Sequence, residues 1–206
     1  MSEINYTCSL GSLCHSSKIL ERNKYKLCSY PFDWIFSNCN NIIHCIEDNF
    51  NIFLDKSYYI TVSQSKCGHS KYHNCMFNHH NPLINIDHYN YYIRCVDRFK
   101  NLLQKKEHKL FIMILTNKIE IVKNDFDYII DFNNKFSKYT SNYTLLVIFH
   151  IAKKKKNNHI FTYNNNIHFL ELHTLSLSNG NNFFDENDNI YLDNIIKSKY
   201  NFNIKN

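Results

Sequence analysis

The chain has 206 residues, of which 44% are hydrophobic and 16% aromatic, and its formal net charge is +6. This apolar content excludes a disordered protein, and the length suffices for one well-buried core, so we expect a single domain spanning residues 1–206. The positive charge comes mostly from scattered lysines, which argues for solubility and against a dedicated nucleic-acid surface. The densest run, Lys153 to Lys156, has no aromatic platform and is expected to form a solvated loop.

The cysteines and the N-terminal segment indicate the compartment. No basic region followed by an apolar signal core opens the sequence, so we expect a cytoplasmic, reducing location and free thiols. No apolar run approaches the roughly 18 residues that span a bilayer, which argues against a membrane partner. The eight cysteines lie at positions 8, 14, 28, 39, 45, 67, 75 and 95.

The first predicted elements are a strand over Tyr6 to Leu10 and a short helix from Cys14 to about Asn23. A second helix follows, for which Ser37 or Asn38 is available as the N-terminal cap. Its apolar residues recur at helical spacing, at Ile42, Ile46, Phe50, Phe53 and Leu54.

The remaining elements alternate between helix and strand. Apolar runs predict buried strands over 110–115, 144–149 and 167–172, and a helix is expected before each of the first two and after the third. The helical stripes are Tyr92, Val96, Phe99 and Leu103, then Ile119, Val122, Phe126, Ile129 and Phe136, and finally Ile190, Ile195 and Ile196.

This order predicts an α/β fold, in which a mainly parallel central sheet is flanked by helices as a three-layer sandwich. Residues 57–90 fit the alternation poorly because they are rich in His, Asn, Tyr and Cys. We expect them to form a His/Cys-rich loop excursion over one end of the sheet, where the functional loops of such folds tend to lie.

Cys14 is the first candidate for chemistry. It follows a strand and the Gly11 turn, at the expected start of a helix, where unpaired N–H groups and the helix dipole favour the thiolate and should lower its pKa. A nucleophilic thiolate needs a general base, for which His79 and His80 in the irregular segment are better placed than His15. The alternative is that Cys14 is a small buried hydrophobe.

Four sequence blocks carry a family resemblance. The blocks are SLGSLC at 9–14, SYPFDW at 29–34, FNHH at 77–80 and YYIRCVDRFKNLL at 91–103. Together they resemble the family of putative papain-like cysteine peptidases found in bacteria and large DNA viruses. Their order and spacing match that family along about the first half of the chain.

The resemblance implies that Cys14 is the nucleophile and that His79 or His80 is the base. Asp33 also matches a motif position, where its carboxylate would either orient the imidazole or hold its own loop through backbone hydrogen bonds; we favour the second.

Three further residues are candidates for substrate binding. Arg94 and Arg98 match a motif of two arginines four residues apart, so they would clamp a carboxylate or phosphate, or pair with acidic neighbours. Trp34 is assigned to substrate binding as well, although the alternation of Tyr30, Phe32 and Trp34 would also suit packing into the core.

The chain departs from papain itself in two respects. A Gln upstream of the nucleophile would stabilise the oxyanion in papain, whereas this chain has Cys8 at that place, so the oxyanion hole is unassigned. The alternating α/β pattern also differs from the papain architecture of a helical half facing an antiparallel sheet.

Three function hypotheses follow. The first is a cysteine hydrolase acting on a peptide, isopeptide or other acyl bond without a cofactor, which requires the Cys14 sulfur to lie within about 4 Å of an imidazole nitrogen. The second is a non-catalytic interaction or carbohydrate-related scaffold. The third is a zinc-binding module, whose ligand candidates are Cys67, His69, His73, Cys75, His79 and His80.

Overall fold

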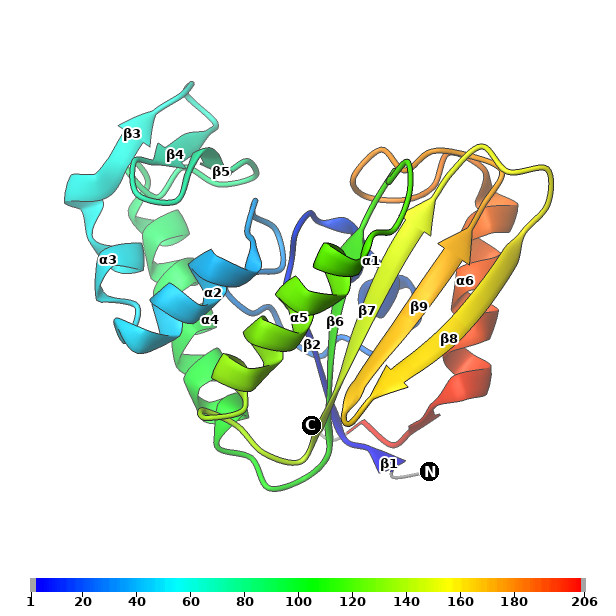
Figure 1. The fold of residues 1–206 in the computed structure, drawn as a ribbon. Coiled ribbons are helices and arrows are strands. Elements are labelled where there is room, and N and C mark those ends of the chain that lie inside the picture. The colour runs from blue at the N-terminus through cyan, green and yellow to red at the C-terminus, as the bar shows by residue number, and fades with distance from the viewer. Residues whose placement is uncertain (1–2, 205–206) are drawn as a thin grey trace.

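The computed structural model describes residues 3–204 and contains a five-stranded, mostly parallel sheet between layers of helices (Figure 1). Four strands run parallel, and β8 pairs with β9 in the antiparallel sense. The predicted α/β sandwich is therefore confirmed. Across the sheet the strands are β2 (Tyr6–Ser9), β6 (Lys109–Leu115), β7 (Tyr143–Ile151), β9 (Ile167–His173) and β8 (Asn158–Asn164).

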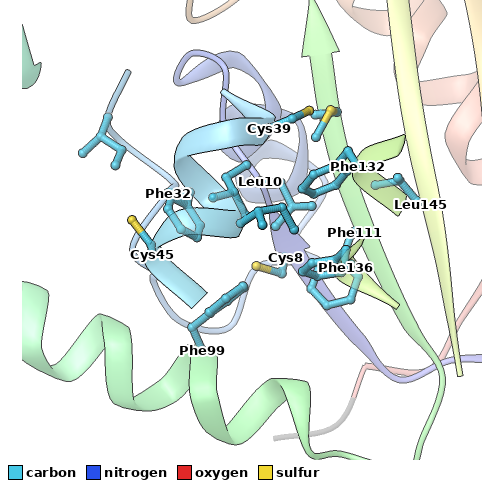
Figure 2. Close-up of a cluster of buried hydrophobic side chains, with 14 of the residues drawn as sticks. Cys8, Leu10, Phe32, Cys39, Cys45, Phe99, Phe111, Phe132, Phe136 and Leu145 are labelled. Atoms are coloured by element: carbon cyan, nitrogen blue, oxygen red, sulfur yellow. The ribbon is translucent and has the colours of Figure 1, made fainter. Parts of the chain in front are cut away.

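Helices cover both faces of this sheet. One face packs against α1 (His15–Arg22) and α6 (Glu186–Lys199), and the other packs against α2 (Cys39–Glu47), α4 (Ile86–Leu103) and α5 (Lys123–Phe136). Strand side chains alternate between the two cores, so every residue of β7 is buried. Figure 2 shows part of the core between the sheet and helices α2, α4 and α5. Here Cys8 of β2 and Leu10, which follows that strand, pack with Phe32, Phe99 and Phe111.

The segment 57–90 is not the loop that we predicted. After the short helices α3 (Asn51–Leu54) and η1 (Lys56–Tyr58), three strands form a separate antiparallel sheet, which lies at one end of the molecule in Figure 1. The second and third of these strands pair Cys67 with Phe77 and His69 with His73, and Cys67, Met76 and Phe77 are buried in the core. The strands are β3 (Tyr59–Thr61), β4 (Cys67–His69) and β5 (His73–Phe77).

Other boundaries differ more modestly. The edge strand β8 was not predicted, nor were the two-residue strands β1 (Glu3–Ile4) and β10 (Asn201–Phe202), which pair in parallel. Helix α5 begins at Lys123, so Ile119 lies outside it and is 94% exposed. Asn38 caps α2 as predicted, because its side chain accepts a hydrogen bond of 2.9 Å from the Asn41 N–H.

The parallel strands direct their carboxyl ends toward one edge, marked by the arrowheads of β7 and β9 in Figure 1. Ligand sites of open α/β sheets lie outside the carboxyl ends of the strands. Within residues 3–204, no helix has the length and apolar character needed to cross a membrane.

Replacement of Phe99 by alanine should lower the free energy of unfolding by about 3–5 kcal/mol, because the fully buried ring packs edge-on against Phe32 and Phe50. Urea denaturation followed by circular dichroism measures this change. The matched control is Phe184→Ala, which removes a ring that is 71% exposed and should change stability by less than about 0.5 kcal/mol. Equal losses for both variants would contradict the packing described for α4.

Candidate active site

A tight turn after β2 positions Cys14. Gly11 and Ser12 have φ values of +79° and +70°, a left-handed conformation that glycine adopts without a steric penalty. The Ser37 hydroxyl accepts a hydrogen bond of 3.3 Å from the Ser12 N–H and donates one of 3.2 Å to the Leu10 carbonyl. The turn thereby places Cys14 at the N-cap of α1.

The Cys14 sulfur lies 3.3 Å from Nε2 of His79. This distance is inside the limit of about 4 Å that the hydrolase hypothesis sets for apo geometry. His79 is exposed and lies in the connection between β5 and α4. The fold thus brings together two side chains that are 65 positions apart in the sequence. The Trp34 ring meets the His79 ring edge-on, with 6.4 Å between ring centroids. Three predicted site residues are thus neighbours.

The environment of Cys14 raises the pKa of its thiol, contrary to our expectation from the helix terminus. Burial is the largest cause; the Cys14 backbone N–H and the Lys18 ammonium act in the opposite direction, and the Asp33 carboxylate raises the pKa further. Partial burial therefore outweighs the helix terminus here. A thiol of this kind needs a base to ionise it near neutral pH, and the imidazole of His79 is in contact with it.

Asp33 lies in the loop that carries Trp34 and is fully buried. Its carboxylate accepts a 2.7 Å hydrogen bond from the Tyr30 N–H and forms an ion pair with Lys26. Burial raises the pKa of Asp33, whereas Lys26 and the Tyr30 N–H lower it. The Lys26 ammonium also lies 5.0 Å above the Trp34 ring. These contacts are those of a loop-holding residue that fixes Trp34 beside His79.

His80 occupies a different environment from His79. Its ring stacks on Tyr91 of α4 at 4.6 Å and meets His88 edge-on at 4.9 Å. Burial, and then the neighbouring imidazoles of His88 and His79, lower the pKa of His80. Of the two candidate bases, His79 is therefore the one that contacts Cys14, and His80 anchors the connecting segment to α4.

The two arginines do not join this group. Arg94 and Arg98 are exposed on α4, and Arg98 donates a hydrogen bond of 3.4 Å to the Ser29 carbonyl. Neither residue lines the cavity beside Cys14. Their helical spacing put them on one face as expected, but that face points to solvent.

A cavity of about 310 Å³ opens beside the Cys14–His79 pair. Apolar side chains form one part of its wall, and the connections that follow β6 and β9 form the opposite part. No Asp, Glu, Lys or Arg is among its lining residues. These are Leu13, Cys14, Trp34, Ile35, Phe36, Asn78, His79, Thr116, Asn117, Ser178, Asn179, Gly180 and Asn181.

The sequence analysis did not identify the polar lining residues that follow β6 and β9. Asn117 links these two connections, because its Oδ1 accepts a hydrogen bond from the Ser178 N–H and its Nδ2 donates one to the Ser178 carbonyl, each at 2.8 Å. The Ser178 hydroxyl in turn lies 2.9 Å from Nδ1 of the buried His15. Asn117 follows the strand predicted at 110–115, so its place at the carboxyl edge was a usable signal.

The six zinc-ligand candidates of residues 67–80 are dispersed. His69 donates to the Ile52 carbonyl at 3.0 Å, and His73 stacks on Phe36 at 4.8 Å. His79 and His80 have the separate partners described above. In the part of the chain that the structure describes, no group of three or more His, Cys, Asp or Glu side chains could hold a metal ion.

Comparison with known proteins finds one family match, and it covers the N-terminal segment that contains Cys14. Residues 5–71 match the model of the family described as putative papain-like cysteine peptidase. No curated protein and no solved structure matches the chain. The matched segment contains Cys14, Asp33 and Trp34 and ends before His79. Over residues 5–71, the resemblance of this chain to the putative papain-like cysteine peptidase family is therefore confirmed.

Proposed function

We propose that the protein is a thiol hydrolase that cleaves a peptide, isopeptide or related acyl bond, with Cys14 as nucleophile and His79 as general base. The 3.3 Å contact between the Cys14 sulfur and Nε2 of His79 carries this proposal. The cavity beside the pair offers space for an acyl group, and the family match over residues 5–71 supports the same chemistry.

In the proposed reaction, Nε2 of His79 takes the thiol proton as the Cys14 sulfur attacks the carbonyl carbon. The negative oxygen of the tetrahedral intermediate would lie at the start of α1, where backbone N–H groups have no intrahelical acceptor. The His79 imidazolium then gives its proton to the leaving group. Water, activated by the same imidazole, hydrolyses the thioester and restores the thiol.

Cys8 takes no part in this reaction. It is buried, and its thiol donates to the Ser9 carbonyl at 3.3 Å. It therefore does not replace the Gln that supports the oxyanion in papain, and backbone donors at the start of α1 are the candidates for that role.

The proposed machinery is a dyad. Asp33 is engaged by Lys26 and the Tyr30 N–H, so it acts on the imidazole through the position of Trp34 and not by direct contact. The edge-on Trp34 ring supplies the lateral restraint on His79. All eight cysteines are free thiols, which supports the proposed reducing, cytoplasmic setting.

The first test compares the alkylation rate of Cys14 in three proteins at pH 7. His79→Ala should slow alkylation about 100-fold, because the thiol loses its base. His80→Phe is the matched control, since it removes the adjacent imidazole and keeps a ring against Tyr91, and its rate should stay within about threefold of the wild-type value. Mass spectrometry of the modified peptide identifies the labelled cysteine. Equal rates for wild type and His79→Ala would refute the proposed base.

The second test follows the same rates as pH rises. Burial raises the pKa of the Cys14 thiol, so alkylation of the His79→Ala variant should be slow at neutral pH and should rise steadily as the pH increases. The alkylation rate of the wild-type protein should exceed that of the variant at pH 7. The two rates should converge at high pH, where the thiol ionises without a base. A variant that reacts at pH 7 as fast as wild type would contradict the raised pKa of Cys14. Equal, slow labelling of several cysteines in both proteins would favour the scaffold alternative.

A further inference from the structure

A second hollow continues from the cavity beside Cys14. It has a volume of about 360 Å³, and Asn117 lines both spaces. It lies where β6 and β7 end, next to the connection that follows β9. The two hollows therefore form neighbouring parts of one edge of the sheet. The lining residues of the second are Asn117, Lys118, Ile119, Ile151, Ala152, Lys153, Lys154 and Leu177.

The charge changes sharply between the two hollows. The cavity at Cys14 has no Lys, Arg, Asp or Glu in its lining, whereas the second hollow has three lysines and no acidic residue. Lys118 forms an ion pair with Asp125 at 2.8 Å. Within residues 3–204, none of the ion pairs involves the exposed run from Lys153 to Lys156. Uncompensated positive charge is thus concentrated beyond the reaction centre.

Backbone contacts hold this lysine run at the edge of the sheet. The Lys154 N–H donates to the Thr174 carbonyl at 2.9 Å, and the Thr174 N–H donates to the Ile151 carbonyl at 3.1 Å. The run belongs to the β7–β8 connection, which leaves the carboxyl edge of β7 (Figure 1). The apolar lining residues of this hollow are Ile119, Ile151, Ala152 and Leu177, of which Ile119 is 94% exposed. A chain lying here would contact both apolar side chains and lysine ammonium groups.

We propose that the substrate is a polypeptide with acidic residues flanking the scissile bond, and that this acidic flank lies in the second hollow against Lys153 and Lys154. The proposal rests on the hydrolase function proposed above. Opposite charge favours both the encounter and the alignment of the flank, and the effect is screened by salt. A single-stranded nucleic acid fits less well, since no aromatic side chain lines this hollow for base stacking.

The test uses two peptides with a central dehydroalanine, an electrophile that captures a thiol and leaves the chain on both sides in place. One peptide has aspartates on both flanks and the other has asparagines, so the two differ in charge and not in shape. At about 20 mM salt the acidic peptide should label Cys14 about fivefold faster, and at about 1 M salt the advantage should vanish. The double variant Lys153→Gln/Lys154→Gln should reduce the low-salt advantage below about twofold.

The control is Lys105→Gln/Lys106→Gln, which removes the same charge from exposed residues before β6, at the opposite edge of the sheet. It should keep the fivefold advantage. The acidic-flank proposal would be overturned if both double variants lost the faster labelling by the acidic peptide, or if the wild-type protein did not show it. In either case, labelling of Cys14 itself would still support the hydrolase. Slow labelling of Cys14 by both peptides, no faster than of other cysteines, would instead overturn the hydrolase. If a short single-stranded RNA inhibits labelling by the acidic peptide more strongly than an aspartate peptide does, the acidic-flank proposal is overturned, and the second hollow is a nucleic-acid site instead.

Discussion

The close approach of two backbone segments at Gly11 is the constraint on which the site depends. A Cβ atom at this position would collide with the Ser37 hydroxyl and would lie 2.9 Å from the Phe32 carbonyl oxygen. Because Gly11 lacks that atom, the turn after β2 lies directly against the segment that contains Trp34. The same contact fixes the direction in which α1 starts, and so the position of Cys14. The first two sequence blocks of the family resemblance are therefore parts of one packed unit.

The central sheet was predictable because its parallel strands are buried on both faces. Strands in that position are continuous apolar runs, as at 110–115 and 144–149, and such runs stand out in a sequence rich in Asn and Lys. Strand β8 gave no such signal, since most of its side chains are exposed and it pairs along one edge only. The sheet of β3, β4 and β5 was missed for a related reason: its strands are three to five residues long and their polar composition indicates a loop.

The site was predictable to the extent that local chain geometry determines it. The strand, the glycine and the position before a helix singled out Cys14, but nothing local distinguishes His79 from His80. That choice depends on tertiary packing, because the Tyr91 ring on α4 holds His80 and leaves His79 to turn toward the sulfur. The same limit applies to Arg94 and Arg98. Helical spacing predicts that they share a face, whereas the packing of α4 decides that this face is exposed.

The electrostatics of the site also follow from burial and not from motif. A helix N-terminus stabilises a thiolate, yet removal of the Cys14 sulfur from water disfavours its charge more strongly, and the buried Asp33 carboxylate acts in the same direction. Lys26 limits that repulsion, because it pairs with Asp33 at the base of the loop that carries Trp34. A buried carboxylate without this partner would be costly to the fold and would further suppress the thiolate. The ion pair thus compensates the buried Asp33 charge and limits its repulsion of a Cys14 thiolate, while His79, the second member of the proposed dyad, is exposed.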